Sequence, residues 1–182
     1  GDFQKQKYRL EEKLLKSYPE EIQIQKTRID ALQQDSQIAA AHPQDKENFC
    51  GMTIKGMVYD DKKAAGERLL LARQEMPNAD MMLLGTYRGF ELNIRFDSFK
   101  NEHQAVLRAE LSYPVSLGDD ARGNITRLDN AIDNFADRIA DAENALQNLE
   151  QQQQAAEVEV ATPFAQEEDL AEKSARLAEL NA

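Results

Sequence analysis

The residues of this chain that could do chemistry are basic and aromatic side chains in its middle third. Tyr87-Arg88-Gly89-Phe90 places a guanidinium between two aromatic rings. Arginine and aromatic side chains on a sheet can hold phosphates and stack on bases. A nucleic-acid contact would use six residues: Lys62, Lys63, Tyr87, Arg88, Arg95 and Arg108. Ordinary solvated strand faces explain the pattern at least as well, because residues 50–118 hold nine acidic residues beside nine basic ones.

Other catalytic and metal-binding chemistries find little support in the residue types. His42 and His103 have no cysteine or second histidine at ligand spacing, so we expect no metal site. Cys50 is the single cysteine, has no base nearby in sequence and is expected to be a small buried residue. Since no nucleophile, base and anion stabiliser can be assembled, we expect no catalytic residue, no cofactor and no enzymatic activity in this piece.

The charge is distributed unevenly along the chain. Residues 119–182 carry fifteen acidic and five basic residues, which is nearly all of the net charge of −11. An acidic segment repels a phosphate backbone, so any nucleic-acid contact would come from the neutral middle. A lone cysteine suits a reducing cytoplasm, and no apolar run reaches membrane-spanning length. We therefore expect a cytoplasmic protein with no membrane partner.

A heptad ladder in the last third of the chain is its strongest structural signal. Residues recur at alternating steps of three and four, and only Gln153 interrupts the apolar series Ile125, Leu128, Ile132, Phe135, Ile139, Ala142, Leu146, Leu149, Gln153, Ala156 and Val160. Such a narrow stripe requires a partner helix. The spacing predicts one helix of roughly 54 Å, begun by Asn124 or Thr126 as cap. We expect it to end near Thr162-Pro163, with a final helix from about Phe164.

The first forty residues predict its partner. Residues 3–16 have helical spacing, Ser17-Tyr18-Pro19 interrupts it, and a second helix is expected from Pro19 to about Ala41. His42-Pro43 ends that helix, since a residue before proline avoids helical backbone angles.

The middle of the chain changes to strand periodicity. We expect a hairpin over 52–54 and 57–59 that turns at Lys55-Gly56, followed by a helix over 62–75 capped by Asp60 or Asp61. Alternating apolar residues then predict three strands, at 83–87, 90–96 and 105–117, of which the first two join at Arg88-Gly89. Pro114 places the last of them at a sheet edge.

Together these patterns predict an α+β fold. A long antiparallel helical coiled-coil hairpin carries a small mixed antiparallel-sheet domain with one helix. We expect four parts: an N-terminal helical arm at 1–48, a small α+β domain at 49–118, a long coiled-coil helix at 119–162 and a terminal helix at 163–182. Because the chain begins with Gly1 and ends within a helical pattern, we expect it to be a fragment of a larger protein.

Several separated blocks carry a resemblance to a known family. They are Ala39–Pro43, Gly51–Gly56 with Tyr59 and Asp61–Glu67, Leu84–Leu92, Leu111–Gly118, Gly123–Ala131 and Pro163–Asn181. In this order they resemble the C-terminal region of very large helicase–methyltransferase proteins carried by conjugative elements of gut bacteria. The resemblance covers nearly the whole chain, and Pro114 departs from it.

The resemblance implies a parent protein with an adenine-type DNA methyltransferase region and a Swi/Snf-type ATP-driven DNA motor, in the bacterial cytoplasm. The motor's phosphate-binding and acidic motifs and an Asn-Pro-Pro-Tyr-like methyltransferase motif are absent from these 182 residues. No catalytic residue is carried over, so the resemblance implies a non-catalytic arm within a DNA-processing protein of a mobile element.

The sequence thus favours a coiled-coil interaction module that positions a small domain for contact with DNA or with other parts of the parent. Two alternatives remain open at this point. One is a nucleic-acid-binding module that acts through the six residues named above. The other is a homodimerisation device, in which the stripe at 125–160 pairs with a second copy of the chain.

Overall fold

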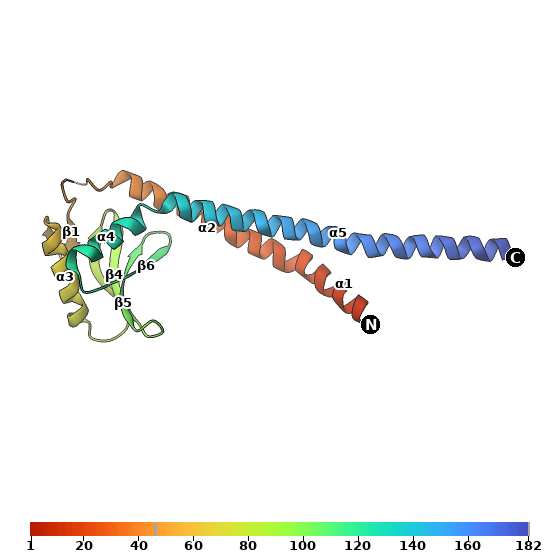
Figure 1. The fold of residues 1–182 in the computed structure, drawn as a ribbon, viewed down its shortest axis with the longest axis horizontal. Coiled ribbons are helices and arrows are strands. Elements are labelled where there is room, and N and C mark those ends of the chain that lie inside the picture. The colour runs from red at the N-terminus through yellow and green to blue at the C-terminus, as the bar shows by residue number, and fades with distance from the viewer. Residues whose placement is uncertain (46, 182) are drawn as a thin grey trace. The chain divides into compact units, whose positions relative to one another are not determined.

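The computed structural model describes residues 1–45 and 47–181 (Figure 1). It confirms the α+β class, with α-helices and one six-stranded antiparallel sheet. The chain divides into two compact units, which are treated separately below. The sheet unit comprises residues 29–140, and the helical unit comprises residues 1–28 together with 141–182. Among the described residues, no helix combines the length and hydropathy needed to cross a membrane.

The first forty residues are helical without the expected interruption. Helix α1 (Asp2–Glu12) continues through the π-helical segment η1 (Lys13–Ser17) into α2 (Tyr18–Ala41). The backbone N–H of Tyr18 donates to the carbonyl of Lys13, five residues earlier. A wider turn directly before Pro19 lets the helix pass a residue that has no N–H to donate. The predicted break at Ser17-Tyr18-Pro19 is therefore wrong, whereas the end of α2 before His42-Pro43 is confirmed.

The hairpin and helix predicted after residue 50 are both present. Strands β1 (Met52–Ile54) and β2 (Met57–Tyr59) pair antiparallel, and Lys55 and Gly56 take positive φ angles of 52° and 79° in their turn. Such angles are typical of a two-residue hairpin turn. Helix α3 (Lys62–Glu75) follows, and the carboxylate of Asp61 caps it by accepting the N–H of Ala64 at 2.9 Å.

Four further strands complete the sheet: β3 (Met82–Tyr87), β4 (Phe90–Asp97), β5 (Glu102–Arg108) and β6 (Ser112–Ser116). The order is β2-β1-β3-β4-β5-β6, with all neighbours antiparallel. Pro114 lies in β6 at the edge, as predicted, where its missing N–H breaks no ladder between two strands.

The strand predicted over 105–117 is wrong, because the chain turns at 109–111 and forms β5 and β6 instead. Asp35 of α2 explains the turn. Its buried carboxylate accepts the N–H groups of Glu110 and Leu111 at 2.9 and 3.0 Å, and the hydroxyl of Tyr113 at 2.5 Å. These bonds satisfy backbone donors that the turn takes out of the ladder.

The single helix predicted through the heptad ladder is divided in two. Helix α4 (Ala121–Ile132) ends at Asp133, and α5 (Phe135–Asn181) follows. The cap of α4 is Asp120, which accepts the N–H of Gly123 at 3.0 Å, and not Asn124 or Thr126. The side chain of Asn124 is instead buried and bonds both backbone groups of Gly118.

Helix α5 also continues past Thr162-Pro163, where we predicted its end and the start of a separate terminal helix. A proline inside a helix removes one backbone bond and introduces a clash, at a cost of about 3 kcal/mol. That cost disfavours a helix near the proline. It does not end α5, which extends for many residues before and after this position. The expected boundary between residues 162 and 163 is therefore not a boundary between helices.

The core of the sheet unit lies between the sheet and two helices. Helix α3 packs against β1, β2 and α4, and α4 packs against β6. Side chains that alternate along the strands meet the apolar faces of these helices. The most deeply buried are Ile54, Leu69, Leu92, Ile94, Leu107, Ile125 and Leu128. A Cβ on Gly66 of α3 would lie 2.2 Å from the carbonyl oxygen of Ala121, so glycine permits the close approach of α3 and α4.

Three aromatic rings extend this core to the start of α5. Phe90 stacks on Phe135 with ring centroids 6.0 Å apart, and Tyr113 meets both rings edge-on at 6.2 and 5.1 Å. The guanidinium of Arg138 covers the ring of Tyr113 at 4.9 Å. Such pairs add to the gain from burial alone. They fix the first turn of α5 to the sheet.

The helical unit has a much smaller core. Among its described side chains, the buried hydrophobic ones are Ala142 and Ala156. Shallow grooves are lined jointly by its two segments: Ile24 lies in one with Leu149, and Leu14 lies in another with Val160. From the first of these grooves to the second, the residue number falls along the N-terminal segment and rises along α5.

Candidate functional site

The strongest concentration of polar contacts lies in the sheet unit, at the turn between β3 and β4. Arg88 and Gly89 form this turn with positive φ angles of 48° and 81°. The turn lies against the end of α2, where a Cβ on Gly89 would approach Nδ1 of His42 to 2.6 Å. Only glycine combines the positive φ angle with the small size that this position requires. The turn thereby brings Arg88 next to the end of α2.

Arg88 is buried, and each nitrogen of its guanidinium donates a hydrogen bond within the protein. Its Nε donates to the carbonyl oxygen of His42 at 2.8 Å. One terminal nitrogen donates to Asp129 Oδ1 at 3.2 Å and the other to Asp133 Oδ1 at 2.7 Å. Burial lowers the pKa of Arg88, but the hydrogen bond and charge of Asp133, together with those of Asp129, outweigh it and raise the pKa. The side chain is a permanent cation that binds α4 to the end of α2.

Tyr87 is buried next to Arg88, with only 1% of its surface exposed. Its hydroxyl donates to Asp129 Oδ1 at 2.6 Å and accepts from Gln44 Nε2 at 3.0 Å. The ring of Phe49 stacks against it at 6.0 Å. Burial, and next the hydrogen bond and charge of Asp129, raise the pKa of Tyr87 far above the usual range. The loop after α2 is thereby attached to β3 and α4.

The other four residues predicted to contact nucleic acid do not join this cluster. Lys62 Nζ donates to Thr126 Oγ1 at 3.0 Å, and Lys63 lies 4.0 Å from Glu67 on the surface of α3. Arg95 donates to Gln104 at 3.0 Å, and Arg108 lies 3.8 Å from Glu91 on the neighbouring strand. By strand alternation, Arg95 and Arg108 lie on the sheet face opposite Leu92 and Ile94.

The predicted set is thus distributed over three places. Two members, Tyr87 and Arg88, are buried and bonded to Asp129. The lysines lie on α3, and Arg95 and Arg108 lie on the sheet face away from α3 and α4. Each of the four outer side chains has a partner within the chain. The structure therefore brings together only the pair that is inaccessible to a phosphate or a base.

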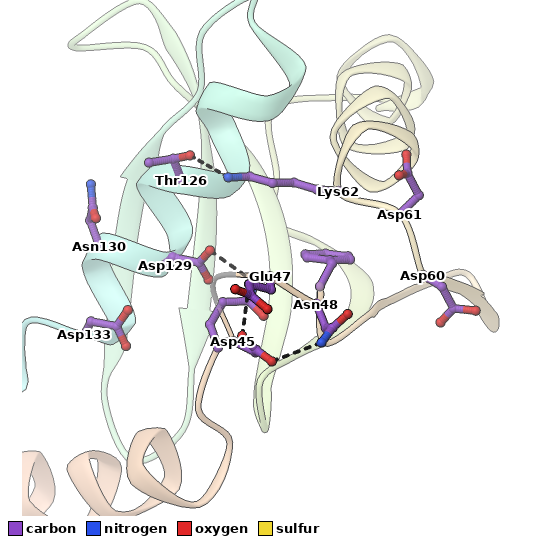
Figure 2. A pocket seen from close by; sticks show the side chains of 12 residues that line it. Asp45, Glu47, Asn48, Asp60, Asp61, Lys62, Thr126, Asp129, Asn130 and Asp133 are labelled. Carbon is purple, nitrogen blue, oxygen red and sulfur yellow. Dashed lines mark hydrogen bonds between the residues drawn. The ribbon is translucent and has the colours of Figure 1, made fainter.

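Sequence reasoning missed a groove beside the Arg88 cluster. It has a volume of about 710 Å³ and lies between the loop after α2, the start of α3 and helix α4 (Figure 2). Half of its twelve lining residues are acidic, and these come from three separate segments: Asp45, Glu47, Asp60, Asp61, Asp129 and Asp133. The available signal was the four-residue spacing of Asp129 and Asp133 beside the apolar Leu128 and Ile132 of a helix.

Most of these carboxylates already have structural partners. Asp61 caps α3, Asp129 and Asp133 pair with Arg88, and Asp45 accepts the N–H of Glu47 at 2.9 Å. Hydrogen bonds from Glu47 and Asn48 lower the pKa of Asp45. Among the described residues, no group of three or more acidic, histidine or cysteine side chains is placed to hold a metal ion. The groove is therefore best understood as the surface of a stabilising network.

Comparison with known proteins adds no assignment. No protein-family model, no curated protein and no solved structure matches this chain. The chemistry of the site therefore rests on the contacts described here.

The histidines and the cysteine lie apart from one another. His42 Nδ1 lies 2.9 Å from the carbonyl of Ile38, and the ring of His103 packs against Phe96 at 5.0 Å. Burial, and next the charge of Arg73, lower the pKa of His103. Cys50 is exposed, contrary to the expected burial, and its N–H donates to Gln44. Partial desolvation and the charge of Asp129 raise the pKa of its thiol, so the thiolate that a nucleophile needs is disfavoured.

The Arg88 cluster predicts a large stability difference between two arginine variants. Arg88→Ala should lower the free energy of unfolding by about 3–5 kcal/mol, because it leaves the carboxylate of Asp129, whose side chain is only 15% exposed, without its cation. Urea denaturation monitored by circular dichroism measures this change. Arg108→Ala is the matched control, since its guanidinium is half exposed and its loss should cost below about 1 kcal/mol. Equal losses for the two variants would show that the cluster contributes no special stability.

The buried phenol of Tyr87 predicts an alkaline transition. The raised pKa keeps the phenol protonated in the folded state, whereas an unfolded tyrosine ionises near pH 10. The contribution of the protonated Tyr87 phenol to the free energy of unfolding is complete below about pH 10 and is lost as the pH rises above it. Tyr87→Phe should reduce the decline in unfolding free energy above about pH 10. Tyr8→Phe, at a ring that is 68% exposed, should leave the decline unchanged. An identical decline in both variants would contradict the assignment.

Proposed function

We propose that this chain is a non-catalytic interaction module. The observation that carries the proposal is the contrast between its polar and apolar side chains. Most carboxylates of the groove beside Arg88 have partners within the chain, whereas large apolar side chains of the helical unit remain exposed. Exposed apolar side chains on paired helices are typical of surfaces that bind other proteins. With the family resemblance, this supports a role within a DNA helicase–methyltransferase of a mobile element.

We further propose that the helical segments form an antiparallel coiled-coil hairpin that carries the sheet unit. Its support is the heptad spacing at 135–160 and the grooves that Ile24 shares with Leu149 and Leu14 shares with Val160. The sheet unit is inserted between the two segments of the helical unit, and the boundaries fall inside α2 and α5. In the parent protein, such a hairpin would present the sheet unit to another domain.

A nucleic-acid-binding module is the second candidate. Arg108 favours it, since this guanidinium is half exposed on a sheet face. Tyr87 and Arg88, which were its central residues, are committed to Asp129, Asp133 and His42. The balanced charge of the middle segment adds no net attraction for phosphates. We therefore rank it below the interaction module.

Titration with DNA separates the two candidates. For an interaction module, labelled duplex and single strands at low salt should show no change in anisotropy up to about 50 µM protein, which corresponds to very weak binding. Salt-dependent binding that is lost in Arg108→Ala and kept in Lys5→Ala, a lysine of the helical unit, would overturn the proposal in favour of nucleic-acid recognition.

Chemical cross-linking tests the hairpin. In a Cys50→Ser background, Ile24→Cys combined with Leu149→Cys should react with a short bismaleimide and migrate as a cross-linked single chain. The matched control combines Ile24→Cys with Val158→Cys, nine residues further along α5 and therefore about 14 Å away along the helix axis. Efficient cross-linking of the control, or none in the first pair, would contradict the antiparallel pairing.

A further inference from the structure

More large apolar side chains of the helical unit are exposed than fully buried. Its buried hydrophobic side chains among the described residues are two alanines, Ala142 and Ala156. In contrast, eight large apolar side chains of the same unit are at least half exposed: Phe3, Tyr8, Leu15, Ile24, Val158, Leu170, Leu177 and Leu180. Two antiparallel helices share a single line of contact, and the rest of their apolar surface needs another partner.

The exposed residues lie on both segments of the unit. On the N-terminal segment, Leu10 and Leu14 line the grooves shared with α5, whereas Tyr8 and Leu15 are 68% and 83% exposed. Tyr8 lines a separate shallow groove with Lys5 and Arg9. This segment therefore has a second apolar line, which residues of α5 do not occupy.

On α5, Leu170 and Leu177 are exposed at a spacing of seven residues. This spacing places them on one line of the helix. They also continue the heptad positions of Leu149 and Ala156. The α5 surface that is shared with the N-terminal segment is thus continuous with an exposed apolar line.

The two segments also carry opposite charge. Residues 1–28 contain seven basic and five acidic residues, and residues 141–182 contain two basic and ten acidic residues. Pairing two copies of the acidic segment would bring like charges together, whereas pairing each segment with the other kind brings opposite charges together. In an assembly of two copies, the charge pattern therefore favours contacts between unlike segments over contacts between like ones.

We propose that the occupant of these exposed lines is a second copy of this chain. Two helical units associate as a four-helix arrangement in which segments 1–28 and 141–182 alternate. Each N-terminal segment then contacts the acidic segment of its own chain on one side and that of the partner on the other. The contact is the same on both copies, as a two-fold dimer requires. This inference deepens the interaction module proposed above by naming its partner.

Mass measurement in solution tests the dimer. Light scattering coupled to size exclusion, at about 100 µM protein and low salt, should give twice the chain mass of 20.6 kDa. The combined change Tyr8→Gln and Leu15→Gln should raise the dissociation constant at least about tenfold, a loss of roughly 1.4 kcal/mol. Raising the salt to about 0.5 M should also weaken association, because the attraction between the segments is screened.

The matched control places the same chemistry on the sheet unit. Phe99 and Leu83 are exposed there, and Phe99→Gln with Leu83→Gln should leave the dimer intact. Circular dichroism verifies that each variant keeps its helix content. A single-chain mass for the unchanged protein overturns the inference, and so does a dimer lost only in the control or strengthened by salt. The cross-link within one chain would still form in those cases, so failure of the dimer is distinguishable from failure of the hairpin.

Discussion

The arrangement of the sheet unit depends on the hydrogen bonds and ion pairs of the Arg88 guanidinium. A buried cation is costly unless each of its donors has a partner, so its position fixes the groups around it. Three such groups come from segments far apart in sequence. They are the carbonyl of His42, directly after α2, and the carboxylates of Asp129 and Asp133 near the end of α4. The break between α4 and α5 follows directly after Asp133. One side chain on a tight turn thus connects the end of one helix with the end of another.

Asp35 plays the complementary part on the same helix. Its carboxylate is fully buried and receives three hydrogen bonds from the β5–β6 turn and Tyr113. Arg88 bonds the chain at His42, directly after α2. Asp35 bonds the β5–β6 turn from a position on α2 about two helical turns before His42. Apolar contacts supply most of the stability, but they are not directional. These hydrogen bonds to charged side chains define where residues 29–41 of α2 pack within the sheet unit.

Local signals in the sequence were sufficient for much of the fold. Lys55-Gly56 and Arg88-Gly89 marked their turns, Asp60 or Asp61 marked the start of α3, and Pro114 marked the sheet edge. Features determined by distant partners could not be predicted in this way. The turn at 109–111 depends on Asp35, more than seventy residues earlier. The end of α4 coincides with a contact from Arg88, although the heptad spacing continues through it.

The candidate site was predicted least well for the same reason. Residue type alone made Tyr87 and Arg88 candidates for a nucleic-acid surface, because an exposed and a buried arginine look alike in sequence. Asp129 and Asp133 are their partners, and they lie more than forty residues further on. The pair of acids next to Leu128 and Ile132, beside the apolar stripe of a helix, was the one indication that a buried cation would meet them.

The insertion of the sheet unit between the two segments of the helical unit has a consequence for biosynthesis. Residues 1–28 leave the ribosome more than 100 residues before the segment at 141–182 with which they form a unit. At translation rates of about 5–20 residues per second this delay is on the order of 10 s, which is long compared with the folding of a small domain. The sheet unit can therefore fold before the segment that completes the helical unit has been synthesised.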